Sequence, residues 1–287
     1  MPIPIVFSTD HNFVMPTGVS IHSLLKHAKE DYEIFILMGE DVTEEDKGRL
    51  KKEVEQTKPT SKISFIELKD EFSSGYEVRG ISKACYYRLL IPWLLPDVDK
   101  IIYSDGDIIF KKDISELMDI DLGDNYIGAI HKEAFVTHKK MCKHIKKIGA
   151  SPEKYVNSGF LVINSKKQRE DNLKSKYIEL AQNRYKYQDQ DILNIVCLDR
   201  IKFIDGTYNV TAKFYNKFNP KDVKVIHYTG FKPWNAFTFC WVDWWDDYNT
   251  STFYQPELNY KISARYFDKV QILKDSWALI KNKFFNL

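Results

Sequence analysis

The sequence predicts an α/β fold, a mainly parallel sheet flanked by helices. In the first half of the chain, short apolar runs with strand character alternate with helical patterns, and such alternation favours parallel pairing. The composition, 44% hydrophobic and 29% charged over 287 residues, suits one globular core of near-maximal size. These observations predict a single large domain with a short C-terminal appendage.

The first half contains four expected strands and three expected helices. A helix is expected after the first strand, with Val19, Leu24 and Leu25 among its apolar positions. Thr43 and Asp46 form a capping box that opens a charged helix to about residue 57. A third helix is expected over residues 81–95, ended or kinked by Pro92. The strands are expected at residues 4–8, 33–37, 62–68 and 100–103.

The second half alternates less regularly. Strands are expected at residues 155–163 and 223–226, and helices at 172–183 and from 187 onward. The last of these helices has acidic residues in its first turn, where the helix dipole favours them.

Net charge, cysteine spacing and hydropathy limit the partners, metal sites and cellular location that are expected for this protein. The net charge of +2 predicts no nucleic-acid partner. The four cysteines are far apart, so a zinc-finger spacing is excluded. The N-terminus lacks the pattern of a signal peptide, and the longest apolar run is too short to span a bilayer. A cytoplasmic protein is therefore expected.

Acidic residues follow one of the buried strands. The Asp-x-Asp pattern occurs four times, at 97/99, 105/107, 119/121 and 189/191, and a single copy is weak support for a site. The copy at Asp105-Gly106-Asp107 differs because it lies between two apolar, strand-like runs. Ligands of parallel sheets bind beyond the carboxyl ends of strands, where residues 8–10 are also expected.

Two carboxylates at such a place would repel each other unless a cation or a proton lies between them. Mn²⁺ or Mg²⁺ takes oxygen ligands and leaves positions open for phosphate oxygens. His227 is the candidate third ligand, and an imidazole would favour Mn²⁺. Near it, Gly230 allows close backbone approach, Lys232 offers a cation for a phosphate, and Trp234 is a candidate wall of the pocket.

These residues belong to five ordered blocks that together resemble glycosyltransferase family 8, the retaining transferases that include lipopolysaccharide α-galactosyltransferases and glycogenin. The resemblance covers residues 3–250. The blocks are residues 6–13, 84–89, 100–107, 157–164 together with 187–194, and 227–234.

The resemblance implies a GT-A fold for residues 1–250, with a single Rossmann-like mixed sheet, and a UDP-sugar donor. It implies Asp105, Asp107 and His227 as metal ligands. The residues that it implies for donor binding are Ser8, Asp10, Asn12, Phe13, Arg88, Ser104, Asp105, Gly106, Asn157, Asp191, Gly230 and Lys232. Gln190 and Asp189 are implied beside the transferred sugar and are the candidate catalytic residues.

The expected reaction moves a hexose, galactose or glucose, from UDP to a hydroxyl of a glycan or lipid-linked saccharide, with retention. An amide is a poor nucleophile, so Gln190 favours front-side attack over a covalent intermediate. Two other classes stay open: a metal-dependent phosphohydrolase or nucleotidyltransferase, and a non-catalytic nucleotide-sugar-binding module.

The expected appendage, residues 251–287, is an amphipathic helical tail. Its segment 261–287 has a net charge of +4. Apolar residues recur at steps of three and four, which predicts one helical face: Ile262, Tyr266, Val270, Leu273, Trp277, Ile280 and Phe284. Such a helix suits an anionic membrane surface, here the inner face of the cell membrane. Packing on the body or in a homodimer is the alternative.

Overall fold

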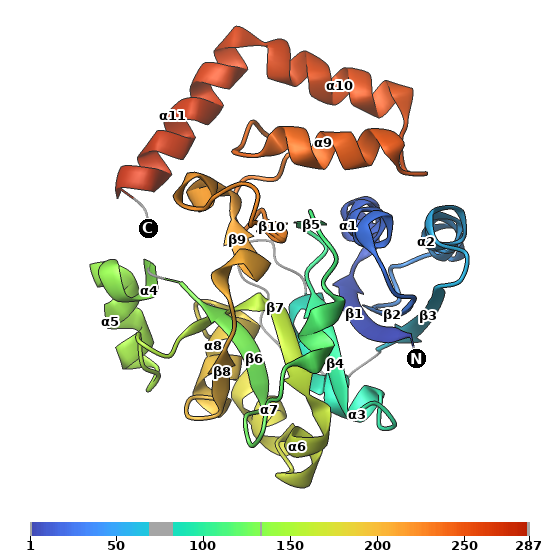
Figure 1. The fold of residues 1–287 in the computed structure, drawn as a ribbon. Coiled ribbons are helices and arrows are strands. Elements are labelled where there is room, and N and C mark those ends of the chain that lie inside the picture. Colours follow the sequence, from blue (N-terminus) through green and yellow to red (C-terminus); the bar gives the residue numbers. More distant parts are fainter. Residues whose placement is uncertain (1, 69–82, 133, 286–287) are drawn as a thin grey trace.

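A seven-stranded mixed sheet forms the centre of the protein (Figure 1), in the order β3-β2-β1-β4-β7-β6-β8. The structure is a computed structural model, and it describes residues 2–68, 83–132 and 134–285. Strands β1 to β4 pair in parallel, β7 runs antiparallel to both β4 and β6, and β8 pairs in parallel with β6. The strands are β1 (Ile3–Thr9), β2 (Tyr32–Met38), β3 (Lys62–Glu67), β4 (Lys100–Ser104), β6 (Ile127–His131), β7 (Val156–Asn164) and β8 (Ile201–Phe203).

A smaller three-stranded sheet lies beyond the carboxyl end of β4. It contains β5 (Ile108–Phe110), β10 (Val225–His227) and β9 (Val210–Thr211), in the order β5-β10-β9. Strand β10 runs antiparallel to β5 and parallel to β9. This sheet joins the turn after β4 to segments more than 100 residues later in the sequence.

Helices cover both faces of the central sheet because alternate side chains of its strands point to opposite sides. In β1, Ile5 and Phe7 enter one core and Val6 enters the other. The first core includes α1 (Val14–His27), α2 (Glu44–Thr57) and α9 (Trp241–Thr250). The second includes η2 (Lys83–Leu90), α3 (Ile91–Leu94), α7 (Lys174–Ala181) and α8 (Gln188–Val196). The remaining short helices are η1 (His11–Phe13), η3 (Ser115–Asp119), α4 (Ala134–Thr137), α5 (Lys139–Lys147), α6 (Ser165–Glu170), η4 (Gly206–Asn209) and η5 (Ala212–Lys217).

The expected α/β class and the mixed sheet are confirmed, and so are the strands expected from the apolar runs. Both hydrogen bonds of the capping box at Thr43 and Asp46 are present. The helix expected over residues 81–95 differs. Residues 81 and 82 lie outside the described ranges, and the rest is a 3-10 helix, η2, followed by the single turn α3. Pro92 neither ends nor kinks a long helix: it stands in the first turn of α3, where its missing N–H has no partner to lose.

Helix α9 and the residues after it are fastened to α1 and α2. Lys26 pairs with Asp247 at 2.9 Å. The buried carboxylate of Glu53 binds the His22 ring at 2.7 Å and accepts from both the backbone N–H and the hydroxyl of Thr252. The Phe253 ring is buried against Gly18, where a Cβ would come within 2.1 Å of the ring. The chain just beyond residue 250 is therefore held to the body, and a domain division at residue 250 stays a prediction.

The tail forms two helices, α10 (Pro256–Phe267) and α11 (Lys269–Phe285), which meet at an angle in Figure 1. Asp268 separates them and caps α11 by accepting from the Gln271 N–H. The periodic run expected on one helical face is thus divided between two helices.

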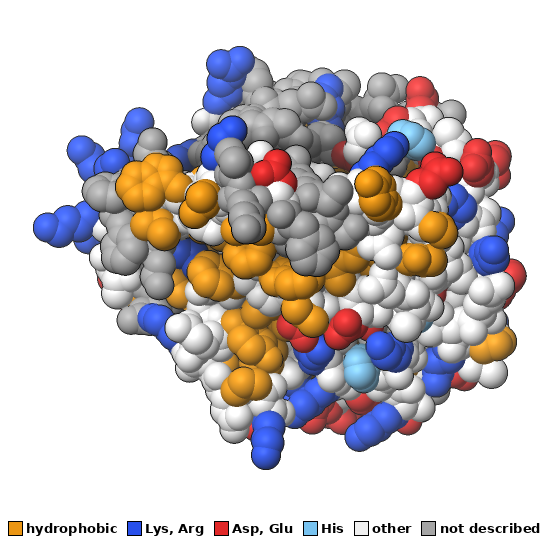
Figure 2. All heavy atoms as spheres, turned by 90° about the horizontal axis from the view of Figure 1, so that it is seen from above, with side chains coloured by type: hydrophobic (Ala, Val, Ile, Leu, Met, Phe, Trp, Pro, Cys, Tyr) orange, Lys and Arg blue, Asp and Glu red, His pale blue; other side chains and the backbone are white. Residues whose placement is uncertain are grey.

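On α11, Leu273, Trp277 and Ile280 are exposed, at 69%, 66% and 45%. Figure 2 looks onto the side of α9 to α11, where hydrophobic side chains gather next to lysine and arginine. The remaining expected members of the run, Ile262, Tyr266, Val270 and Phe284, have side chains outside the described set. In the described ranges, no helix is both long and apolar enough to cross a membrane. Docking of this face on an anionic membrane or on a second copy stays a prediction.

Candidate metal and donor site

Asp105, Asp107 and His227 converge where the two sheets meet. One ligand atom from each lies within 4.8 Å of the others. His227 Nε2 is 3.2 Å from Asp107 Oδ1 and 3.7 Å from Asp105 Oδ2. Pairing of β5 with β10 places Ile108 opposite His227, and the Tyr228 N–H donates to the Asp107 carbonyl. The smaller sheet therefore brings a distant histidine to the Asp-Gly-Asp turn.

Two glycines make room for this cluster. A Cβ at Gly159 in β7 would lie 2.3 Å from His227 Cε1 and 2.4 Å from Asp105 Oδ2. A Cβ at Gly106 would lie 2.3 Å from the hydroxyl of Thr17 in α1. Real Cβ contacts are not this short, because dispersion contacts are favourable only near 3.5–4.0 Å. The absence of a side chain at Gly159 therefore leaves room for Asp105 and His227, and its absence at Gly106 lets the turn that carries both aspartates lie against α1.

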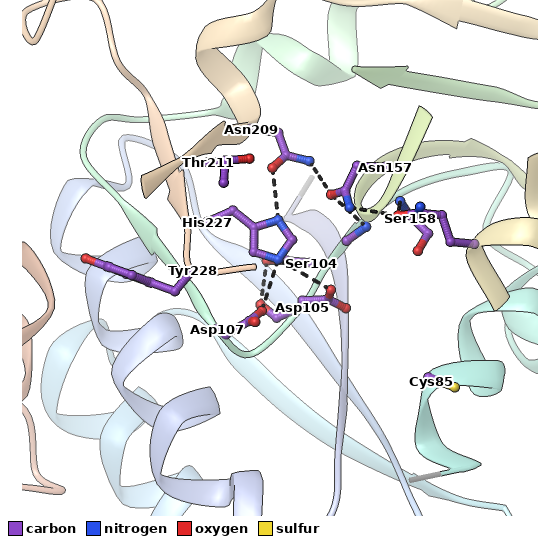
Figure 3. A network of polar contacts seen from close by, with 12 residues as sticks. Cys85, Ser104, Asp105, Asp107, Asn157, Ser158, Asn209, Thr211, His227 and Tyr228 are labelled. Atoms are coloured by element: carbon purple, nitrogen blue, oxygen red, sulfur yellow. Dashed lines mark hydrogen bonds and ion pairs between the residues drawn. The ribbon is translucent and has the colours of Figure 1, made fainter. Parts of the chain in front are cut away.

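Asn209 sets the orientation of the His227 ring. Its Oδ1 lies 2.9 Å from His227 Nδ1, and Figure 3 shows the ring between Asn209 on one side and the two aspartates on the other. A proton on Nδ1 leaves the lone pair of Nε2 directed at the carboxylates. This is how metal-ligating histidines are usually oriented.

Arg88 links the metal cluster to α8. It is 7% exposed and pairs with Asp105 at 2.8 Å and with Asp189 at 3.1 Å, and it donates to the Ser158 carbonyl at 2.8 Å. The Tyr103 hydroxyl donates to the same Asp105 oxygen at 2.8 Å. Burial raises the pKa of Asp189, and the charge of Arg88 only partly offsets this. The buried guanidinium group of Arg88 thus holds the Asp105 carboxylate in place.

Lys232 forms an ion pair with the second carboxylate of the cluster, that of Asp107. Its ammonium group donates to Asp107 and, at 2.7 Å, to the Tyr228 carbonyl. Burial alone would raise the pKa of Asp107, but its neighbours, the Lys232 ammonium group foremost, outweigh it and hold the pKa well below its usual range. Asp107 is therefore ionised and ready to bind a cation.

Asn157 and Gln190 adjoin the cluster, whereas Asp191 does not. Asn157 Nδ2 donates to Gln190 Oε1 at 2.9 Å, and Asn157 Oδ1 accepts from Asn209 at 2.8 Å. Asp191 is fully buried, and its two oxygens are engaged by Tyr155 and by His144 together with a backbone N–H. The donor contact expected for Asp191 is thus not available to its side chain in this structure.

The residues expected at the base of the donor lie at the neighbouring strand end. The pairing of β1 with β4 sets Phe7 opposite Ser104, so the segment 8–13 begins beside the Asp-Gly-Asp turn. Asp10 caps η1 by accepting from the Phe13 N–H at 3.0 Å. The Phe13 ring meets Trp234 edge-on, with centroids 5.7 Å apart.

The other donor-site candidates are distributed around the same edge. Ser8 is the next-to-last residue of β1, Asn12 is exposed, and Ser104 is buried and donates to the Asp105 carbonyl. Gly230 is exposed, with no atom near the position of a Cβ.

Four residues that contact this site were not predicted from the sequence: Asn209, Ser158, Tyr155 and Lys132. Asn209 lies in a short 3-10 turn and Lys132 directly after β6, while Tyr155 and Ser158 lie in the expected strand 155–163, whose pattern does not show which polar groups meet the site. An asparagine in the 3-10 turn η4 looks like any turn residue until the ring beside it is known.

The residues fit a divalent cation. Two carboxylates and one imidazole nitrogen converge, the glycines leave space, and the ring is oriented with Nε2 toward the cluster. A donor set of two oxygens and one imidazole suits Mn²⁺ and accepts Mg²⁺. The fold and the site together define an α/β protein with a candidate cation site beyond the carboxyl end of β4.

Comparison with known proteins identifies the family. The profile described as glycosyl transferase family 8 matches residues 4–238, and the chain belongs to this family. Lipopolysaccharide 1,3-galactosyltransferase of Salmonella typhimurium is 27% identical over 81% of this chain and 73% of its own length.

Solved structures agree. The galactosyltransferase LgtC, crystallised in complex with donor and acceptor sugar analogs, matches with a TM-score of 0.76 and 25% identity. The match covers 90% of this chain and 100% of that one. The apo structure of the bifunctional glycosyltransferase WbbM matches with a TM-score of 0.75 and 25% identity over 92% of this chain, which spans about half of that chain, 51%. The protein is therefore a glycosyltransferase with a GT-A fold, and the phosphohydrolase, nucleotidyltransferase and binding-module alternatives gain no support.

Proposed function

We propose that this protein transfers a hexose, galactose or glucose, from a UDP-hexose to a hydroxyl of a saccharide or lipid-linked saccharide, with retention of configuration. The observation that carries the proposal is the convergence of Asp105, Asp107 and His227, with Lys232 on Asp107. Two of the relatives are named lipopolysaccharide 1,3-galactosyltransferase and lipopolysaccharide glucosyltransferase, which supports the donor class.

Asp105, Asp107 and His227 would hold Mn²⁺ or Mg²⁺. A bound divalent cation would supply positive charge for the diphosphate leaving group. Lys232 lies close enough to this site to exchange Asp107 for a phosphate oxygen, adding a second positive charge. Arg88 keeps Asp105 oriented, because the guanidinium group is itself buried and held by Asp189 and by the Ser158 carbonyl.

Phe13 and Trp234 form an aromatic corner at the end of β1, and we assign the uracil ring to it. Ser8, Asp10 and Asn12 border the same edge. Gly230 lets the backbone approach the diphosphate. The hexose would then extend toward Asn157 and Gln190, which adjoin the metal cluster through Asn209.

Retention is assigned to front-side attack. A covalent intermediate needs a free carboxylate, but Asp189 is engaged by Arg88 and by the hydroxyl of Ser158 at 2.9 Å. Gln190 offers only an amide oxygen. In the proposed step the bond from the anomeric carbon to UDP breaks and a bond to the acceptor oxygen forms on the same face. The acceptor proton passes to an oxygen of the departing phosphate. In this proposal Asp189 acts indirectly, by holding Arg88 against Asp105, and Gln190 contacts the transferred sugar.

The test is UDP release from a panel of UDP-sugars in the presence of Mn²⁺, with the product configuration assigned by NMR. We expect slow hydrolysis of one UDP-hexose without acceptor, abolished by a chelator. Absence of binding to every UDP-sugar would overturn the assignment. A product with inverted anomeric configuration would rule out front-side attack.

A further inference from the structure

Lys132 directly follows β6, and the proposed reaction gives it no role. Its Nζ donates to the Asn209 carbonyl at 3.0 Å, to Asn209 Oδ1 at 3.2 Å and to the Thr211 hydroxyl at 2.6 Å. Burial lowers the pKa of Lys132 to about 7. Burial of this ammonium group disfavours its charged form and so costs stability.

Two donors converge on one oxygen of Asn209. Lys132 Nζ and His227 Nδ1 both contact Asn209 Oδ1, at 3.2 Å and 2.9 Å. A carboxamide has nearly the same shape after a half-turn that exchanges its oxygen and nitrogen. With the oxygen toward the ring, His227 keeps its proton on Nδ1. With the nitrogen there, the proton moves to Nε2, and no lone pair faces the carboxylates.

Lys132 opposes that half-turn. The charged ammonium group of Lys132 has three N–H groups and no lone pair, so a rotated Asn209 would place its own N–H against donors that cannot accept it. Rotation would also break the bond from Asn209 Nδ2 to Asn157 Oδ1, at 2.8 Å. That oxygen is itself fixed by the backbone N–H of Gly159, at 3.3 Å.

The same orientation is passed to the proposed sugar side. Asn157 Nδ2 donates to Gln190 Oε1 at 2.9 Å, and Gln190 Nε2 contacts the Tyr155 hydroxyl at 3.1 Å. Tyr155 donates to the Asp191 carboxylate at 2.5 Å. In this series of hydrogen bonds every donor points away from Lys132, and the series ends on the Asp191 carboxylate, which only accepts. One polarity therefore runs from Asn209 to Gln190.

We propose that Lys132 is a positioning residue of the metal site: through Asn209 it keeps the His227 proton on Nδ1 and leaves Nε2 available for a divalent cation. The inference rests on the proposed function, because it assumes that a cation binds at Asp105, Asp107 and His227.

The experiment compares Lys132→Met with Thr211→Val, using Mn²⁺ alone as the probe and electron paramagnetic resonance to count free ions. Changes behind a metal-binding histidine typically lower affinity about 10–100-fold, and we expect a loss of this size for Lys132→Met. Thr211→Val removes a different partner of Lys132 and leaves its contacts with Asn209 intact, so its affinity should stay near that of the wild type.

A rescue separates positioning from simple structural support. Asn209→Asp introduces a carboxylate, which only accepts and so presents an acceptor to His227 Nδ1 in either orientation. Added to Lys132→Met, it should restore Mn²⁺ affinity. Turnover should stay low, because a carboxylate cannot donate to Asn157. A double variant that binds Mn²⁺ no better than Lys132→Met, although thermal melting shows it folded, would contradict the proposal.

The tautomer is a readout independent of the metal. Nitrogen-15 NMR of the neutral His227 ring in the metal-free protein should show the proton on Nδ1 in the wild type and on Nε2 in Lys132→Met. If the His227 tautomer and the Mn²⁺ affinity were both unchanged in that variant, the role of Lys132 would be overturned, while the proposed function of the protein would stand. A wild type that binds no Mn²⁺ would instead refute the proposed function, and the tautomer would still decide the role of Lys132. If Lys132→Met does not fold, Asn209→Leu removes the same acceptor, and wild-type Mn²⁺ binding by that variant would equally overturn the proposal.

Discussion

Gly159→Ala is the smallest change that should disable the metal cluster. The glycine lies in β7, whose neighbours β4 and β6 fix its backbone, and its carbonyl accepts from the Asp105 N–H at 2.8 Å. Its φ is not positive, so alanine fits the backbone. The added methyl group, however, would stand 2.3 Å from the His227 ring and 2.4 Å from an Asp105 oxygen.

The size of the effect follows from these distances. Ordinary contact requires about 3.5 Å between carbon atoms, so the ring must retreat by about 1.2 Å. Metal–ligand distances tolerate only about ±0.2 Å. His227 is held by Asn209 and Asp105 by Arg88, so neither yields easily. Misplacement by about 1 Å costs on the order of 100-fold in rate, or about 2.7 kcal/mol.

The assays are Mn²⁺ affinity without donor and kcat/KM with the preferred UDP-sugar, with thermal melting as the check on folding. Gly48→Ala is the matched control: this glycine lies in α2, and no atom would meet its Cβ. That change should leave activity intact and raise stability by about 0.5–1 kcal/mol, since alanine favours helix. Wild-type Mn²⁺ affinity and turnover in a folded Gly159→Ala protein would refute the assignment of this cluster as the metal site.

Three further changes probe the surroundings. Arg88→Met strands the buried Asp189 carboxylate and should cost on the order of 3–5 kcal/mol in urea unfolding; a loss below 1 kcal/mol would show that the pair is not buried as described. Burial alone would raise the pKa of Glu53, but hydrogen bonds from a histidine and two threonines outweigh it and lower the pKa. The Glu53 carboxylate therefore stabilises the fold above its unfolded pKa, near 4.5, and this stability is lost as pH falls through the lower folded pKa; Glu53→Gln should melt with less pH dependence in that acid range, and an unchanged profile would contradict the sign. Lys232→Met frees Asp107 of its competing cation, so Mn²⁺ affinity without donor should rise while kcat falls about 10²–10³-fold; a fall in both would place Lys232 among groups that support the metal.

The sequence by itself determined the fold class and most elements of the first half. Strands β1 to β4 and helix α2 are marked by local signals: apolar runs of strand length, and the capping box at Thr43. The same signals placed Asp105 and Asp107 at a strand end. Local patterns suffice for these features because each depends on neighbours a few residues away. The segment 83–94 was harder, because it has helical hydrophobicity but folds as a 3-10 helix and a short turn.

Only the tertiary structure decided which of the candidates meet, and how. His227 reaches Asp107 because β10 pairs with β5 across more than 100 residues of sequence. Asn209 lies in a short 3-10 helix and Lys132 directly after β6, and no local pattern marks either residue as a partner of the His227 ring. Asp191, beside Gln190 in sequence, is turned away into a buried network. The reason is physical: the direction of a side chain and the polarity of its hydrogen bonds depend on partners that the sequence does not place beside it.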